Sequence, residues 1–153
     1  LPTDIRGTKP SNGISLNDFY ASIRDLDFNQ TSIFLDACFS GINRNNESVN
    51  DGLRGTEIAS EEGTLSNGKL VVFSAAQGNE TAQGCKEEGH GLFTYYLIKE
   101  IRDNYGQISF GELSDYIKNN VSRRAMTMKL QKPQTPTTNV TENLTDSWKQ
   151  LRF

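Results

Sequence analysis

TSIFLDACFSG, residues 31–41, is the stretch around which the rest of the chain is organised. Its first part is rich in apolar and β-branched residues and lacks Gly and Pro, which predicts a buried parallel strand at 31–35. Cys38 then lies just past the carboxyl end of this strand, where ligands bind in open α/β sheets. The Ser-Gly that follows favours a cysteine nucleophile whose backbone N–H helps to form an oxyanion hole. The alternative is that Cys38 is a small buried apolar residue, as most free cysteines are.

The motif DACFSG at 36–41 resembles the nucleophile motif of caspase-like cysteine peptidases, especially the metacaspases and bacterial caspase homologues. Further segments resemble that family's next strand, substrate-side loop and following helix, in the same order: LVVFSAA at 70–76, NETA at 79–82 and GHGLFTYYL at 89–97. The resemblance spans residues 1–116. It implies a three-layer α/β fold with a mostly parallel central sheet flanked by helices, in which Ser74, Ala75 and Ala76 bind the substrate.

Asp36 carries the argument about specificity. Caspases that cut after Asp have Gln at this position of their Gln-Ala-Cys motif. A carboxylate here would face the same pocket and reverse its charge, which favours Arg or Lys before the cut through a charge-assisted hydrogen bond. Metacaspase-like enzymes are known for that preference. The alternative is that Asp36 caps the turn by accepting hydrogen bonds from backbone amides.

His90 is the only histidine in the sequence. Caspases place the catalytic base about 50 residues before the cysteine, whereas His90 follows it. In the family, a His-Gly on the preceding strand supplies the base, while His90-Gly91 matches the start of a helix instead. We therefore expect the catalytic His and the first strands of the sheet to be missing from this chain and to come from the N-terminal part of the same precursor, as a second chain. Residues 1–153 would then be the C-terminal part of the catalytic domain, and His90 as the base is the less favoured alternative.

Composition limits the classes of partner. The length fits one domain, and the net charge of -3 argues against a dedicated nucleic-acid binder. No apolar run approaches the roughly 18 residues that a membrane span needs. Two cysteines, one of them in the nucleophile motif, do not make a disulfide framework. We expect a cytoplasmic enzyme without a cofactor that acts on peptides or proteins and binds neither nucleic acid nor membrane.

The remaining elements follow from periodicity and turn chemistry. Apolar residues at helical spacing predict helices at 16–26, 92–103 and 110–124, the last opened by a capping box of Ser109 and Glu112. A second buried parallel strand is predicted at 69–76. Residues 42–69 fit neither period and are expected to be a mobile loop. The resemblance places self-cleavage in this loop, whose two arginines are Arg44 and Arg54. We expect residues 133–153 to be an extended tail with Trp148 as its anchor.

Calcium activates some metacaspases. The positions that resemble the ligands of that site are Asp4, Asp18 and also Asn17, with Asn45 where an acid would be expected. Because calcium prefers several carboxylate oxygens, we predict no metal site.

Three functional hypotheses remain. The first is an Arg/Lys-specific cysteine endopeptidase with a Cys-His dyad. The second is a catalytically silent caspase-like binding module, and the third is a thiol enzyme of another reaction class. The intact motif favours the peptidase, because a silent module has no physical need for both the acid and the thiol.

Overall fold

The computed structural model describes residues 16–24, 26, 28–37, 68–77, 80–128 and 132–153. Cys38, Arg44 and Arg54 lie outside these residues, as do nearly all of the 42–69 loop and the calcium positions Asp4 and Asn45. The roles assigned to them from the sequence therefore stay predictions.

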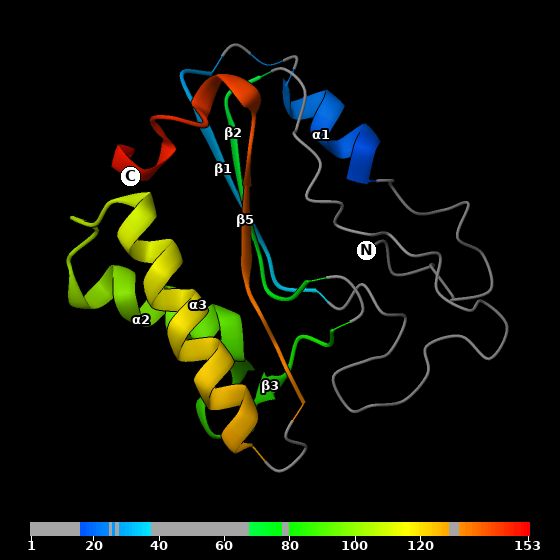
Figure 1. Ribbon diagram of the computed structural model, residues 1–153, viewed down its shortest axis with the longest axis vertical. Helices are drawn as coiled ribbons and strands as arrows, with labels where there is room; N and C mark the ends of the chain where they lie inside the picture. The colour runs from blue at the N-terminus through cyan, green and yellow to red at the C-terminus, as the bar shows by residue number, and fades with distance from the viewer. Residues whose placement is uncertain (1–15, 25, 27, 38–67, 78–79, 129–131) are drawn as a thin grey trace, which may run out of the picture.

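A central sheet with the strand order β1-β2-β5 organises the fold (Figure 1). The strands β1 (Thr31–Leu35) and β2 (Leu70–Ser74) are parallel, as the sequence predicted. On the other side of β2, β5 (Thr137–Val140) pairs antiparallel to it. The sheet that the structure describes thus contains one parallel and one antiparallel pairing, which is compatible with the predicted fold.

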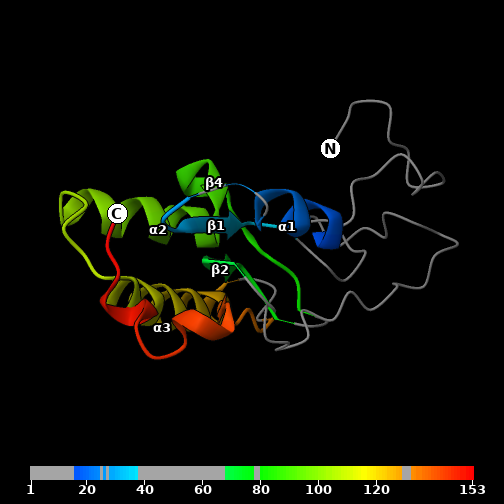
Figure 2. The same cartoon turned by 90° about the horizontal axis from the view of Figure 1, so that it is seen from above.

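Helices cover both faces of this sheet and complete the three layers that were predicted. Figure 1 shows α1 (Leu16–Arg24) on one face, with α2 (Leu92–Asp103) and α3 (Phe110–Thr127) on the other. The view from above in Figure 2 shows that α2 and α3 lie side by side within their layer. Helix α2 has the predicted bounds, while α3 is longer than predicted at its C-terminal end and α1 is shorter.

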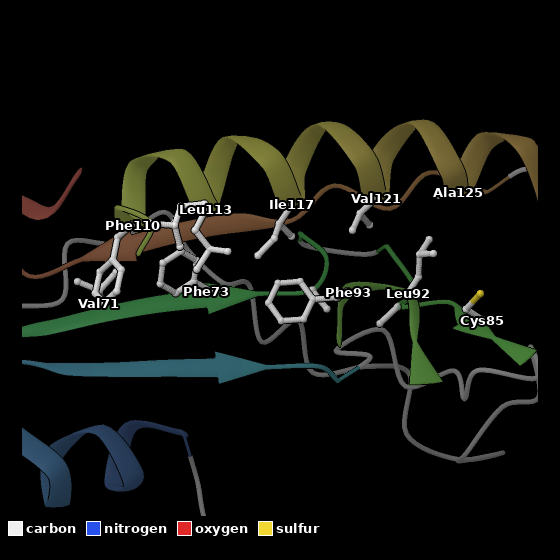
Figure 3. Close-up of a cluster of buried hydrophobic side chains, with 13 residues drawn as sticks. Val71, Phe73, Cys85, Leu92, Phe93, Phe110, Leu113, Ile117, Val121 and Ala125 are labelled. Carbon is white, nitrogen blue, oxygen red and sulfur yellow. The ribbon is translucent and has the colours of Figure 1, made fainter. Parts of the chain in front are cut away.

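Side chains alternate between the two faces of β2, so each face has its own core. Val71 and Phe73 pack in the larger cluster with the apolar side of α3, which Figure 3 shows along the length of that helix. Leu70 and Val72 pack instead with the side chains of α1. All five residues of β2 are buried, as expected of a central strand covered by helices on both sides.

Aromatic rings tie the sheet to α3. The rings of Phe34 on β1 and Phe73 on β2 stack with their centroids 4.9 Å apart. The ring of Phe110, the first residue of α3, meets Phe73 edge to face at 5.7 Å. Such pairs contribute about 0.5 to 1.5 kcal/mol each beyond the area that they bury. The start of α3 is thereby fixed against the middle of the sheet.

The predicted capping box opens α3. Glu112 N–H donates to Ser109 Oγ at 3.3 Å, and Ser109 N–H donates to Glu112 Oε2 at 2.9 Å. The Ser109 hydroxyl, which donates to Glu112 Oε2 at 2.7 Å, and the Ser109 N–H both lower the pKa of the Glu112 carboxyl. Just before the box, Gly106 has a φ of +74°, a left-handed conformation that glycine adopts without strain, and it ends the turn after α2.

The segment 133–153 differs from the extended tail that was expected. It contains β5 and two short 3₁₀ turns, η3 (Glu142–Leu144) and η4 (Trp148–Gln150). Phe110 N–H donates to the Leu151 carbonyl at 2.8 Å, so this segment is hydrogen-bonded to the start of α3. Trp148 packs against the main core, which fits the anchoring role predicted for it.

A small hairpin precedes α2. Its strands are β3 (Gly84–Cys85) and β4 (His90–Gly91), with the 3₁₀ turn η2 (Lys86–Glu88) between them. Periodicity did not indicate these strands, because strands of this length carry no detectable alternation of apolar and polar residues.

Candidate active site

The structure brings the described candidate residues to one edge of the sheet. Because β1 and β2 are parallel and Leu35 lies opposite Ser74, the two strands end at the same level. The pairing continues by one step, since Ala75 N–H donates to the Leu35 carbonyl at 2.9 Å. Asp36, directly after β1, and Ala75, directly after β2, therefore both leave the sheet at its carboxyl edge.

Asp36 is anchored to the start of α2. Its Oδ2 accepts a hydrogen bond of 2.5 Å from the hydroxyl of Thr94, which lies in the first turn of that helix. The residue as a whole is partly exposed, while its Oδ1 is shielded from solvent. The carboxylate is thus partly desolvated and held in place by a side chain 58 positions away.

The start of α2 is suited to an external carboxylate. Its N-cap, Gly91, makes no side-chain capping hydrogen bond, and the first turn contains no acid. A helix N-terminus carries a partial positive charge that favours an anion. The carboxylate of Asp36, which follows β1 and accepts a hydrogen bond from Thr94 in this turn, supplies that negative charge. The sequence did not predict this contact, because no local pattern indicates a partner 58 positions away.

The predicted substrate-binding residues after β2 are buried in this structure. Ser74, Ala75 and Ala76 are 3%, 0% and 1% exposed, respectively. The first exposed residue of this segment is Gln77. Direct contact of these three residues with a substrate stays a prediction. In this structure they are buried next to the carboxyl edge of the sheet.

A buried glutamine holds the segment that follows β2. Gln134 is 1% exposed, and its Nε2 donates to the Ala75 carbonyl at 3.0 Å. Its Oε1 accepts a hydrogen bond from Gln83 N–H at 2.8 Å. Its own carbonyl accepts from Ser122 Oγ of α3 at 3.1 Å. Gln134 therefore connects both ends of the segment 75–83 to α3, and nothing in the local sequence of residues 133–136 indicated this.

A carboxylate makes a second connection between the same two segments. Glu80 accepts a hydrogen bond from Thr135 Oγ1 at 3.0 Å through its Oε1, and one from Thr135 N–H at 2.5 Å through its Oε2. Hydrogen bonds to a charged acceptor are among the stronger ones in proteins. The loop after β2 is therefore held to the segment before β5 at more than one point.

His90 lies on β4, immediately before the N-cap of α2, and is exposed. It pairs across the hairpin with Cys85, whose thiol is free and whose side chain is buried in the main core. Within the described residues, no three His, Cys, Asp or Glu side chains form a group that could hold a metal ion. The described helices also include none that is long and apolar enough to cross a membrane.

Comparison with known proteins identifies the family of this chain. The family model of the caspase domain matches residues 5–145. Because this match covers most of the sequence, the chain belongs to the caspase-domain family of cysteine peptidases. Neither the curated proteins nor the solved structures give a match. The family predicted from the nucleophile motif is confirmed, while the metacaspase branch stays a prediction.

Proposed function

We propose that this chain carries the nucleophile and the main specificity residue of a metacaspase-like cysteine endopeptidase that cleaves after Arg or Lys. The observation that carries the proposal is the position of Asp36. Asp36 lies two positions before the cysteine of the nucleophile motif. Thr94 holds its carboxylate at the carboxyl edge of the sheet. A basic side chain next to a bond attacked by Cys38 would be attracted to this carboxylate.

The reaction that we propose follows the chemistry of a thiol nucleophile. The thiolate of Cys38 attacks the scissile carbonyl carbon, and the developing oxyanion accepts a hydrogen bond from the backbone N–H of Cys38. A histidine then protonates the leaving amine, and the C–N bond breaks to give a thioester. Water, deprotonated by the same histidine, hydrolyses the thioester and restores the thiol.

We further propose that this histidine comes from a polypeptide segment that pairs with β1. Among the described residues, β1 pairs with β2 alone, so its other edge is available for another strand. Four of its five residues are only partly buried, whereas β2 is buried throughout. An added strand would cover this edge and would end beside Asp36, at the edge where the base is needed. The N-terminal part of the same precursor would fit this role as a second chain.

The decisive experiment is a substrate profile of the complete enzyme with a peptide library, for the wild type and for Asp36→Asn. We expect the wild type to cut after Arg and Lys and hardly at all after Asp. Removing one partner of a desolvated charge pair costs at least about 2 kcal/mol. We therefore expect kcat/KM for basic substrates to fall at least about thirtyfold in Asp36→Asn.

Asp103→Asn is the matched control. Asp103 is the last residue of α2, the helix that carries Thr94, and it pairs with Lys99 on the surface. Its substitution therefore removes one negative charge away from the edge of the sheet. We expect its substrate profile to equal that of the wild type. Preferred cleavage after Asp by the wild type, or an unchanged preference for Arg in Asp36→Asn, would refute the assignment of specificity to Asp36.

The same specificity suggests where the enzyme would process itself. Arg44 and Arg54 are the basic residues between Cys38 and Leu65, and we propose them as the self-cleavage sites. Mass spectrometry of the purified enzyme should find new termini after one of them in the wild type and none in Cys38→Ala. We also propose a reducing, cytoplasmic setting, which would keep the Cys38 and Cys85 thiols free.

A further inference from the structure

We propose that Glu80 is a positioning residue whose carboxylate, bound by Thr135, keeps the loop after β2 in the conformation that binds the substrate peptide. This inference rests on the proposed function, because it assumes that a peptide binds at the carboxyl edge of the sheet. It is carried by two hydrogen bonds from Thr135 to Glu80, one of 2.5 Å from the N–H and one of 3.0 Å from Oγ1. It gives a role in substrate binding to two residues outside the nucleophile motif.

The loop that contains Glu80 borders the candidate site. It begins at Ala75, whose N–H donates to the carbonyl of Leu35, the residue before Asp36. Gln77 is the first exposed residue after β2, and its carbonyl accepts a hydrogen bond of 2.9 Å from Glu80 N–H. Gln77 Nε2 also donates to Glu80 Oε1 at 3.4 Å. A peptide whose basic side chain reaches Asp36 would therefore lie next to the segment that leads to Gln77.

Gln134 and Glu80 hold different parts of this loop. The Gln134 side chain binds the Ala75 carbonyl at one end of the loop and the Gln83 N–H at the other. Glu80 lies between these ends, and its carboxylate binds Thr135, the residue after Gln134. Loss of this carboxylate would therefore loosen the part of the loop around Glu80 while both ends stay attached. We expect the fold to tolerate such a loss.

The segment that donates these two hydrogen bonds has little freedom of its own. Pro133 and Pro136 flank it, and a proline fixes its own φ and restricts the residue before it, here Thr135, to extended conformations. Ser122 Oγ on α3 donates to the Gln134 carbonyl at 3.1 Å, which connects the segment to a helix of the main core. The donors of Thr135 are thus held in place for a carboxylate that comes from another part of the chain.

A loop that occupies its binding conformation for only part of the time weakens the apparent affinity by that fraction. A hydrogen bond to a charged group shifts such an equilibrium about tenfold or more. The ordered loop would contact the substrate equally before and during the reaction. Its loosening should therefore raise KM and leave kcat unchanged.

The kinetic test uses the complete enzyme with Glu80→Ala and Glu80→Gln and two peptides that differ only in Arg or Lys before the cut. We expect Glu80→Ala to raise KM about tenfold for both peptides, with kcat within about twofold of the wild type. Glu80→Gln should recover KM to within about threefold, because a side-chain amide can accept from Thr135 N–H and donate to Thr135 Oγ1. Iodoacetamide should alkylate Cys38 at the same rate in all three proteins, because the loop does not change the nucleophile.

Hydrogen exchange tests the contact itself without a substrate. In Glu80→Ala the amide of Thr135 should exchange at least about tenfold faster than in the wild type. The amide of Gln83, which Gln134 binds, should keep its wild-type rate. If Glu80→Ala does not fold, Thr135→Val removes the hydroxyl alone and should raise KM at least about threefold.

Ser109→Ala is the matched control. It removes a hydrogen bond at the N-cap of α3, at the other end of this helix from Ser122. This variant should lose stability without any change in KM. A tenfold rise of KM in Ser109→Ala would contradict the inference, because any loss of stability would then produce the effect.

The outcomes separate this inference from the proposed function. An unchanged KM in Glu80→Ala, together with faster exchange at Thr135, would show that the contact orders the loop without serving the substrate. If Glu80→Gln were as damaging as Glu80→Ala, the charge of Glu80 would act on the substrate directly, and the positioning role would be wrong. A complete enzyme that hydrolyses no peptide would overturn the proposed function, and this inference with it, whatever the exchange rates show.

Discussion

The side-chain amide of Gln134 donates a hydrogen bond of 3.0 Å to the backbone carbonyl of Ala75, 59 positions earlier in the chain. Its oxygen accepts from Gln83 N–H at 2.8 Å. Leu is similar in size to Gln, so Gln134→Leu would leave the Ala75 carbonyl and the Gln83 N–H buried without this partner. Since each such group costs about 1 to 3 kcal/mol, we expect the free energy of unfolding to fall by about 2 to 6 kcal/mol.

Urea unfolding followed by circular dichroism would measure this loss. Gln150→Leu is the control, because Gln150 is exposed and its substitution should change stability by less than about 0.5 kcal/mol. Equal stabilities of the two variants would contradict the role given to Gln134.

The two thiols are predicted to behave in opposite ways. Cys38→Ala should abolish peptidase activity and leave the unfolding midpoint unchanged, because it removes the proposed nucleophile by the loss of a single sulfur atom. Cys85→Ala should retain activity and lower stability by about 1 kcal/mol, because Cys85 is buried in the main core. Peptide hydrolysis and thermal unfolding of both variants test this pair, and an active Cys38→Ala enzyme would disprove the assignment of the nucleophile.

His90→Ala should keep a substantial fraction of the activity. His90 is exposed on the β3–β4 hairpin, and we assign the catalytic base to another segment. The kcat of this variant should be measured beside that of Cys38→Ala. If both substitutions were equally damaging while the fold stayed intact, the base would be His90 and our assignment would be wrong.

The capping box of α3 predicts a dependence of stability on pH. The folded state lowers the pKa of Glu112 through hydrogen bonds from Ser109, so this contribution is fully present above the unfolded pKa of about 4.3. It is lost as the pH falls through the lower folded pKa. Glu112→Gln should therefore be less stable than the wild type at neutral pH, and the difference should shrink at about pH 3.

Thermal unfolding of both proteins at the two pH values would measure this effect. Ser109→Ala should cost about 1 kcal/mol at neutral pH, because it removes the hydroxyl that accepts a hydrogen bond from Glu112 N–H. A difference between wild type and Glu112→Gln that grows on acidification would contradict the expected sign.

Local signals made much of the fold predictable. The apolar spacing from Leu92 onward indicated the bounds of α2, and the pair of Ser109 and Glu112 located the start of α3. The strand β5 was not predicted, because TTNV has no apolar alternation and is defined by its pairing with β2. This pairing joins residues that are distant in the sequence, and no local pattern encodes it.

The residues of the candidate site were also predictable only in part. Asp36 could be identified, because it belongs to a short motif with a known arrangement. Thr94 and Gln134 could not, because their partners lie 58 and 59 positions away, respectively. Both are polar residues whose importance depends on which chain segment the fold brings against them.

The contacts of Gln30 and Phe34 with residues 152–153 have a consequence for synthesis on the ribosome. The Phe34 and Phe153 rings stack with centroids 6.2 Å apart, and Gln30 Nε2 donates to the Arg152 carbonyl at 3.0 Å. These partners are separated by 122 positions for the hydrogen bond, and at about 5 to 20 residues per second the ribosome needs roughly 6 to 24 s to make that length. During this interval the ring of Phe34 lacks the cover that Phe153 gives it in the folded chain, and transiently exposed apolar surface of this kind favours misassociation.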